Sequence, residues 1–144
     1  MKNIELWHQR ARPKVDEAAF NVQLGCHLEE IVEMLTTLVV QDASNYEFIL
    51  SKSTYDLHTL ASALKTGKVT IKLRDREEFL DSLADQVVTT IGVGHCANMK
   101  VAEAIWEVDR SNWSKFENGL PVFKEGGKIA KGEHYRPPNL KGMF

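Results

Sequence analysis

The apolar residues between positions 15 and 40 recur at helical spacing, and this period limits the chain to helical architectures. Their spacing of i, i+4, i+7, i+11 and i+14 places on one side of a helix Leu24, Leu28, Ile31, Leu35 and Leu38. Apolar residues predict three further helices, over about 45–64, 75–99 and 101–116. No long stretch alternates with a period of two. We therefore expect an all-α bundle.

The segments outside these helices have a different composition. The opening dozen residues are compatible with a short helix that ends at Pro13, and we expect residues 68–73 to form an extended connector. After Gly119, paired glycines and prolines interrupt any periodicity. The sequence thus predicts one domain over 1–144 with four to five helices, a lead-in over about 1–14 and an extended basic C-terminal arm over about 119–144.

Length and charge exclude several protein classes. The chain has 144 residues, which suits one domain, and a net charge of −2, which argues against binding a nucleic-acid polymer. Its apolar runs are far shorter than the roughly 20 residues needed to cross a bilayer, so we expect no membrane partner. Two cysteines cannot form a disulfide framework or a zinc ribbon by themselves. We expect a cytoplasmic protein.

The charges are strongly segregated along the chain. Residues 15–51 contain seven acids and no lysine or arginine, and residues 77–99 also lack both basic types. Helical spacing places Glu29, Glu30 and Glu33 on one side of the first long helix. It places Glu78, Asp81 and Asp85 on one side of another. Between 110 and 136 the balance reverses in favour of basic residues.

Two interpretations of the acidic sides stay open. Each lies opposite the main apolar stripe of its helix, where a solvated surface is usual. If the two sides meet, each carboxylate pair at 4–5 Å repels by roughly 3–4 kcal/mol at an effective dielectric near 20. A divalent cation removes that cost, and oxygen-only ligands suit Mg²⁺, with Mn²⁺ as a substitute.

These segments resemble a known family. Residues 28–33, Leu-Glu-Glu-Ile-Val-Glu, resemble the EExxE motif of the all-α nucleoside triphosphate pyrophosphohydrolases, the MazG-like group that includes dimeric dUTPases and dCTP pyrophosphatases. Residues 81–88, Asp-Ser-Leu-Ala-Asp-Gln-Val-Val, resemble its second motif, ExxD followed by apolar residues. Residues 107–115, 127–132 and 135–140 are similar to the C-terminal half of phage and bacterial members described as phosphoribosyl-ATP pyrophosphohydrolase-like.

The resemblance implies a metal site. Glu30 and Glu33 match the metal-binding pair of the first motif, and Asp85 matches the closing Asp of the second. Ser82 stands where ExxD places its glutamate, so Asp81 is the expected fourth ligand, with Glu78 as the alternative. Glu29 matches a first-motif glutamate that serves in some members as the base for the attacking water.

The resemblance also implies a substrate and an assembly. The expected reaction hydrolyses the α–β phosphoanhydride of a nucleoside triphosphate to a monophosphate and pyrophosphate, which would serve to clean the nucleotide pool. Expected contacts with phosphate, sugar or base come from Asn112, Lys115, Lys128, Lys131, Tyr135 and Trp7. Arg110 is a weaker candidate. The family fold implies a homodimer or a homotetramer, with sites between packed helices of two chains.

Two other functions remain as alternatives. The first is phosphoribosyl-ATP pyrophosphohydrolysis in histidine biosynthesis, which shares the reaction type. The second is a helical-bundle adaptor without catalytic activity, whose acidic side binds a basic partner.

Overall fold

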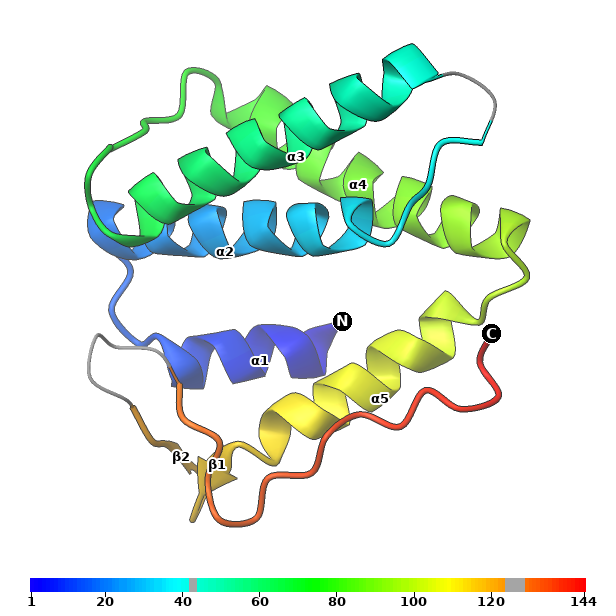
Figure 1. Cartoon of the computed structure of the whole chain (residues 1–144). Helices are drawn as coiled ribbons and strands as arrows, with labels where there is room; N and C mark the ends of the chain where they lie inside the picture. Colours follow the sequence, from blue (N-terminus) through cyan, green and yellow to red (C-terminus); the bar gives the residue numbers. More distant parts are fainter. Residues whose placement is uncertain (42–43, 124–128) are drawn as a thin grey trace. The chain divides into compact units, whose positions relative to one another are not determined.

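The structure, a computed structural model, describes residues 1–41, 44–123 and 129–144. Within them the regular secondary structure is helical except for one small hairpin and an isolated β-bridge between Phe123 and Ile129. The helices are α1 (Lys2–Ala11), α2 (Glu17–Leu35), α3 (Ser44–Lys65), α4 (Arg76–Cys96) and α5 (Val101–Trp113). The strands β1 (Phe116–Glu117) and β2 (Leu120–Pro121) follow α5 (Figure 1). The prediction of an all-α fold is confirmed.

The described residues divide into two compact units. One unit contains Lys14–Leu73, with α2 and α3, and the other combines Met1–Pro13 with Arg74–Phe144. We call them the hairpin unit and the terminal unit, and each is described by itself. The single domain predicted over 1–144 stays a prediction.

In the hairpin unit, α2 and α3 pack closely because Gly25 has no side chain. A Cβ at this position would lie 2.8 Å from the carbonyl oxygen of Ala61 and 3.1 Å from Cβ of Leu64. Asn21 ties the extended connector to α2, since its Oδ1 accepts from the backbone N–H of Ile71 at 2.6 Å. The extended connector predicted at 68–73 is therefore present and has a defined anchor.

Local side chains explain where the long helices begin and end. Asp16 caps α2 by accepting from the Ala19 N–H at 2.8 Å, and Asp75 caps α4 through the Glu77 N–H at 2.9 Å. The predicted helix over 15–40 is too long, because α2 ends at Leu35. Just beyond it, the hydroxyls of Thr36 and Thr37 donate to backbone carbonyls of the last turn. Such hydrogen bonds compete with helix continuation.

In the terminal unit, α1 packs on α5 and the hairpin through aromatic side chains. The Trp7 ring stacks on Phe116 at 5.7 Å between centroids, and Trp113 meets Phe116 edge-on at 5.4 Å. The β1–β2 hairpin turns through Asn118 and Gly119, which both have positive φ angles, of 51° and 77°. This is the backbone that a two-residue type I′ turn requires. The helix predicted to reach residue 116 ends instead at Trp113.

The described part of the C-terminal arm is extended and runs back along α5. The backbone N–H of Arg136 donates to Ser114 Oγ at 2.8 Å, and that of Asn139 donates to Glu107 Oε1 at 2.7 Å. Further along, the Lys100 N–H donates to the carbonyl of Met143 at 2.8 Å. The arm predicted from the glycine and proline pattern is thus docked on its own unit.

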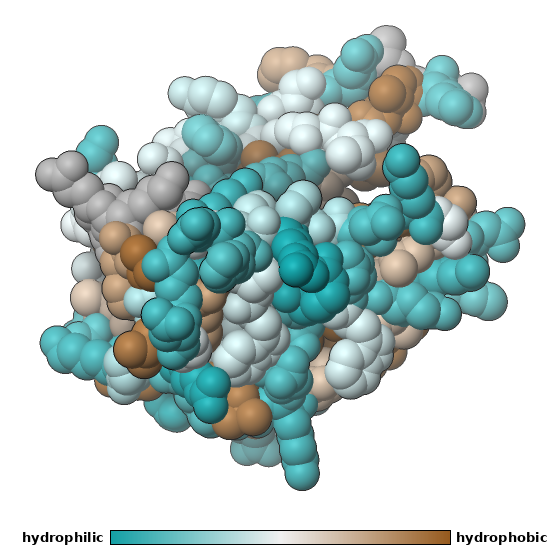
Figure 2. All heavy atoms as spheres, turned by 90° about the horizontal axis from the view of Figure 1, so that it is seen from below, coloured by the Kyte–Doolittle hydropathy of each residue, from teal (hydrophilic) through white to brown (hydrophobic). Residues whose placement is uncertain are grey.

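Most of the face seen in Figure 2 is hydrophilic, with hydrophobic residues in smaller groups.

Within the part of the chain that the structure describes, no helix has both the length and the apolar character needed to span a membrane.

Candidate functional site

The acidic side of α2 carries three glutamates in two different environments. Glu30 and Glu33 are exposed, and neither forms a salt bridge with any residue described by the structure. Glu29 is half-buried and forms an ion pair with Lys65 at the end of α3, where the two side chains are 31% and 27% exposed. The first motif therefore offers two available carboxylates beside one that has a cation of its own.

The Glu29–Lys65 pair bears on the role predicted for Glu29 as a base. The ammonium of Lys65 donates to Oε1 of Glu29, so the carboxylate has a direct partner on α3. The same contact fixes the orientation of the carboxylate, because Lys65 is held by α3. Glu29 is therefore a carboxylate whose orientation is set by a contact from a second helix.

The second motif lies on α4 in the terminal unit. Asp81 and Asp85 are exposed, as is Glu78, and none of the three has a salt-bridge partner among the described residues. Asp75 precedes them and is occupied as the cap of the helix. Both candidates for the fourth ligand, Asp81 and Glu78, therefore remain available, and that alternative stays open.

The carboxylates of the two motifs are chemically suited to binding a magnesium ion. Glu30, Glu33, Asp81 and Asp85 supply only oxygen donors, carry no competing cation in the described chain and are exposed. Mg²⁺ prefers such ligands and keeps several waters when it binds. Across residues 1–41, 44–123 and 129–144, however, no group of three or more His, Cys, Asp or Glu side chains is assembled as a metal site. The two motifs belong to different units, so a shared site remains a prediction.

Asn112 lies at the centre of a polar network in the terminal unit. Its backbone carbonyl accepts from Trp7 Nε1 at 2.9 Å, and its side-chain oxygen accepts from Lys115 Nζ at 2.7 Å. The Lys115 ammonium also lies 5.9 Å from the centre of the Trp7 ring. Three of the predicted substrate-binding residues are therefore in direct contact, although they come from the two ends of the chain.

Trp7 is integrated into this network as a structural group. Its ring stacks on Phe116 with an angle of 17° between the planes, and its N–H is used by Asn112. Any base that stacks on Trp7 would have to use the opposite ring face. Base stacking by Trp7 thus stays a prediction, and Phe116 already occupies one face of the ring.

The arm brings a second pair of predicted residues together. The Lys131 ammonium lies 4.8 Å from the centre of the Tyr135 ring, which is a cation–π distance. Lys131 is exposed and Tyr135 is half-buried. Lys128 lies outside the described residues.

Arg110 is used for holding the arm. Its guanidinium donates to both carboxylate oxygens of Glu107, at 2.8 and 2.7 Å, and to the carbonyl of Pro137 at 3.1 Å. The hydrogen bonds from Arg110, followed by that from the Asn139 N–H, lower the pKa of Glu107 to about 2. Arg110 is therefore less suited to binding phosphate than Lys115.

Two residues in these networks were not predicted from the sequence. Lys65 is the cation that Glu29 contacts, and Asp109 is a buried carboxylate that accepts from Asn3. The available signal for Lys65 was its place as the only basic residue in the last turn of its helix. Nothing in the local pattern distinguishes Asp109 from a surface acid, because the helix α1 that covers it lies over 100 positions earlier.

Comparisons with family models, with curated proteins and with solved structures found no match to this chain.

Proposed function

We propose that this chain is a Mg²⁺-dependent pyrophosphohydrolase that cleaves a nucleoside triphosphate between the α and β phosphates. The observation that carries the proposal is the set of exposed carboxylates on both motifs, Glu30 and Glu33 on α2 and Asp81 and Asp85 on α4. Each helix omits basic residues on the side where they lie. The resemblance of the two motifs and the C-terminal segments to the MazG-like family supports the same activity.

The reaction needs a water to attack phosphorus while pyrophosphate leaves. Bound Mg²⁺ would neutralise phosphate oxygens and make a coordinated water more acidic. Glu29, held by Lys65, would orient the attacking water and receive its proton as the new phosphorus–oxygen bond forms and the bond to the pyrophosphate oxygen breaks. Lys115, positioned by Asn112, stabilises negative charge on the phosphate oxygens, with Lys131 and Lys128 as further cations from the arm.

We propose that the working form is a homodimer or a homotetramer. Three large apolar side chains on α3 are highly exposed in the single chain, with exposed fractions of 70% for Phe48, 52% for Ile49 and 70% for Tyr55. Large exposed apolar surface of this kind marks association surfaces in soluble proteins. Sedimentation velocity at several concentrations tests the proposal, and a monomer at all of them would contradict it.

The activity is tested by measuring pyrophosphate and orthophosphate release from a panel of nucleoside triphosphates and from phosphoribosyl-ATP, with Mg²⁺ or Mn²⁺. We expect pyrophosphate from at least one nucleoside triphosphate. Turnover should be abolished in Glu33→Gln and in Asp85→Asn, while the matched control Glu5→Gln on α1 keeps the wild-type rate. Both active-site variants should fold at least as well as the wild type, because each removes a repelling charge.

Three results would separate the alternatives. Exclusive hydrolysis of phosphoribosyl-ATP would assign the chain to histidine biosynthesis. Normal pyrophosphate release by both variants would remove the carboxylates from the mechanism. An adaptor without catalytic activity would show no release from any substrate and no thermal stabilisation by Mg²⁺, whereas binding at a hundred times the dissociation constant adds about 2.7 kcal/mol.

A further inference from the structure

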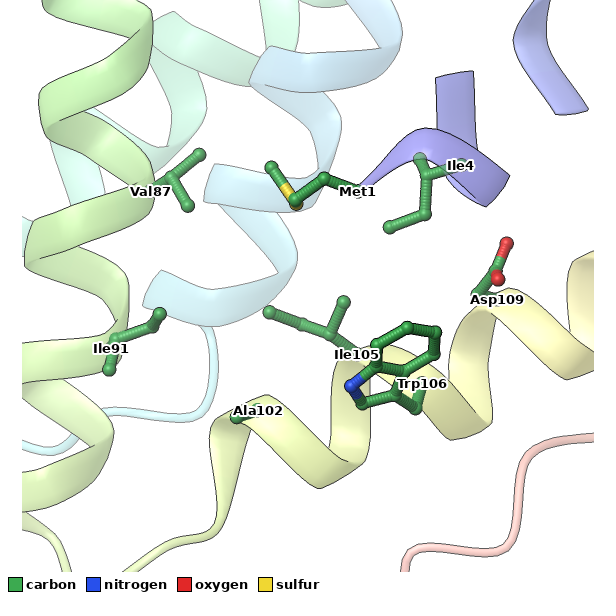
Figure 3. Close-up of a pocket in the computed structure, with 8 residues that line it drawn as sticks. All are labelled: Met1, Ile4, Val87, Ile91, Ala102, Ile105, Trp106 and Asp109. Carbon is green, nitrogen blue, oxygen red and sulfur yellow. The ribbon is translucent and has the colours of Figure 1, made fainter. Parts of the chain in front are cut away.

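The terminal unit contains a cavity with mostly apolar walls and a single carboxylate. Side chains from α1, α4 and α5 line a space of about 160 Å³ that is partly open to solvent, and Figure 3 shows them around it. Its walls include Ile4, Ile91, Ile105 and Trp106, and Asp109 is the one acidic side chain among the lining residues. A protein cavity of about 150 Å³ is known to bind benzene, so this volume matches one six-membered ring.

Asp109 is an unusual residue for the wall of such a cavity. It is only 5% exposed, and Nδ2 of Asn3 donates to one of its oxygens. No basic residue within the described ranges forms a salt bridge with it. A buried carboxylate without a cation is costly and depends on hydrogen-bond donors, and two oxygens offer about four acceptor sites, more than Asn3 fills.

The cavity continues toward the polar network at the end of α5. A neighbouring space of about 270 Å³ shares Ile4, Ile105 and Asp109 with the first and reaches Asn112. Asp109 and Asn112 are three positions apart, so they lie on the same side of α5. A ring bound beside Asp109 could therefore carry a substituent that extends toward Asn112.

We propose that this cavity binds one planar ring that bears an amino group, with the amino N–H donating to the Asp109 carboxylate. The apolar walls favour the faces of the ring, and the indole of Trp106 supplies one aromatic side chain among them. A carboxylate accepts hydrogen bonds but cannot donate, so a ring with a carbonyl oxygen at the same position places two acceptors against each other. Cytosine carries such an amino group, and uracil differs by a carbonyl in its place.

Two kinds of ligand carry a ring of this chemistry. The first is the base of the nucleotide substrate, which rests on the proposed function. The second is a free aminopyrimidine nucleoside that binds without being hydrolysed. The two sources share the contact with Asp109 and differ in whether turnover depends on that contact.

Binding is measured first, by titrating the full-length isotope-labelled protein with cytidine and with uridine and following the amide signals of α5 by NMR. We expect cytidine to bind about 10- to 100-fold more tightly than uridine, the range for a hydrogen bond to a charged group. Asp109→Asn should lose this preference, because the new amide can donate to the uracil carbonyl. The control Glu103→Gln, on an exposed position of the same helix, should keep it.

A second variant covers the case in which Asp109→Asn does not fold. Ala102 is exposed and lines the cavity, so Ala102→Leu fills the space from a surface position with a good helix former. This variant should retain the wild-type circular dichroism spectrum and bind cytidine at least tenfold more weakly. Equal binding of cytidine and uridine by the wild type would overturn the proposal, as would unchanged cytidine binding by a folded Ala102→Leu.

Turnover then identifies the source. If the base of the substrate occupies the cavity, kcat/KM for dCTP over dUTP should fall at least tenfold in Asp109→Asn. If the ratio is unchanged while cytidine binding is lost, the ligand is a separate nucleoside and the cavity assignment stands. Absence of pyrophosphate release from every nucleotide would refute the proposed function but leaves the cytidine titration valid.

Discussion

Gly25 is the position at which a single methyl group best tests the packing of α2 on α3. A Cβ there would lie 2.8 Å from the Ala61 carbonyl oxygen, 2.8 Å from Cγ of Lys65 and 3.1 Å from Cβ of Leu64. The Lys65 chain can shift, but the backbone carbonyl and the buried Leu64 cannot move without displacing α3. Gly25→Ala should therefore push the two helices apart.

The expected magnitude follows from two opposing effects. Alanine improves helix propensity over glycine by about 1 kcal/mol. Overpacking a close contact costs about 1–3 kcal/mol, and contact with a backbone atom favours the upper part of that range. Gly25→Ala should therefore lower the free energy of unfolding by about 1–2 kcal/mol. Displacement of Lys65 from Glu29 should also lower kcat.

Gly92 in α4 provides the matched control. A Cβ at this position would meet no atom within 4 Å, so Gly92→Ala should gain the propensity alone and raise the free energy of unfolding by about 1 kcal/mol. Urea unfolding followed by circular dichroism measures both variants. If Gly25→Ala proves as stable as Gly92→Ala, the close approach of α3 to α2 is not a constraint and the reasoning fails.

Three further predictions concern the site and the arm. Lys65→Met should lower kcat, because the cation that holds the Glu29 carboxylate is removed. Trp7→Phe deletes the hydrogen bond to the Asn112 carbonyl and should lower the free energy of unfolding by about 1 kcal/mol in urea titrations, with a raised KM. The pKa of Glu107 is lowered from 4.5 to about 2, so its contribution to stability is present above pH 4.5 and is lost as the pH falls toward 2. Melting temperatures of the wild type and Glu107→Gln should therefore differ at pH 7 and converge at pH 2.

Each of these has an outcome that contradicts it. An unchanged kcat in Lys65→Met would mean that the ion pair does not position Glu29 for the reaction. A Trp7→Phe variant as stable as the wild type would mean that its N–H finds water equally well. A constant difference in melting temperature from pH 7 to pH 2 would show that Arg110 and the arm do not depend on the Glu107 charge.

Helices were predictable from the sequence because their apolar period is local. The arm was predictable because glycines and prolines interrupt any such period, and the extended connector because residues 68–73 are the one β-leaning stretch. The end of α2 was missed because hydroxyls of Thr36 and Thr37, and not a glycine or proline, accompany it. The hairpin was missed although Asn118-Gly119 is a typical two-residue turn sequence, because strands of two residues leave no alternation to detect.

The candidate site was predictable only where one helix carries it. The glutamates of α2 can be placed on one side from their spacing alone. The pairing of Glu29 with Lys65 could not be predicted, because it depends on how α2 and α3 align. The contact between Trp7 and Asn112 is even harder to predict from the sequence, since the two residues are separated by 105 positions.

The interleaved order of the two units has a consequence for how the protein matures during synthesis. The hairpin unit is a continuous segment, Lys14–Leu73, and can acquire its contacts soon after it leaves the ribosome. Helix α1 emerges before it, yet the partners of Asn3 and Trp7 are translated more than 100 residues later. The first helix to be translated therefore completes its packing late, because Asn3 and Trp7 lack their native hydrogen-bond partners until residues 109 and 112 have been translated.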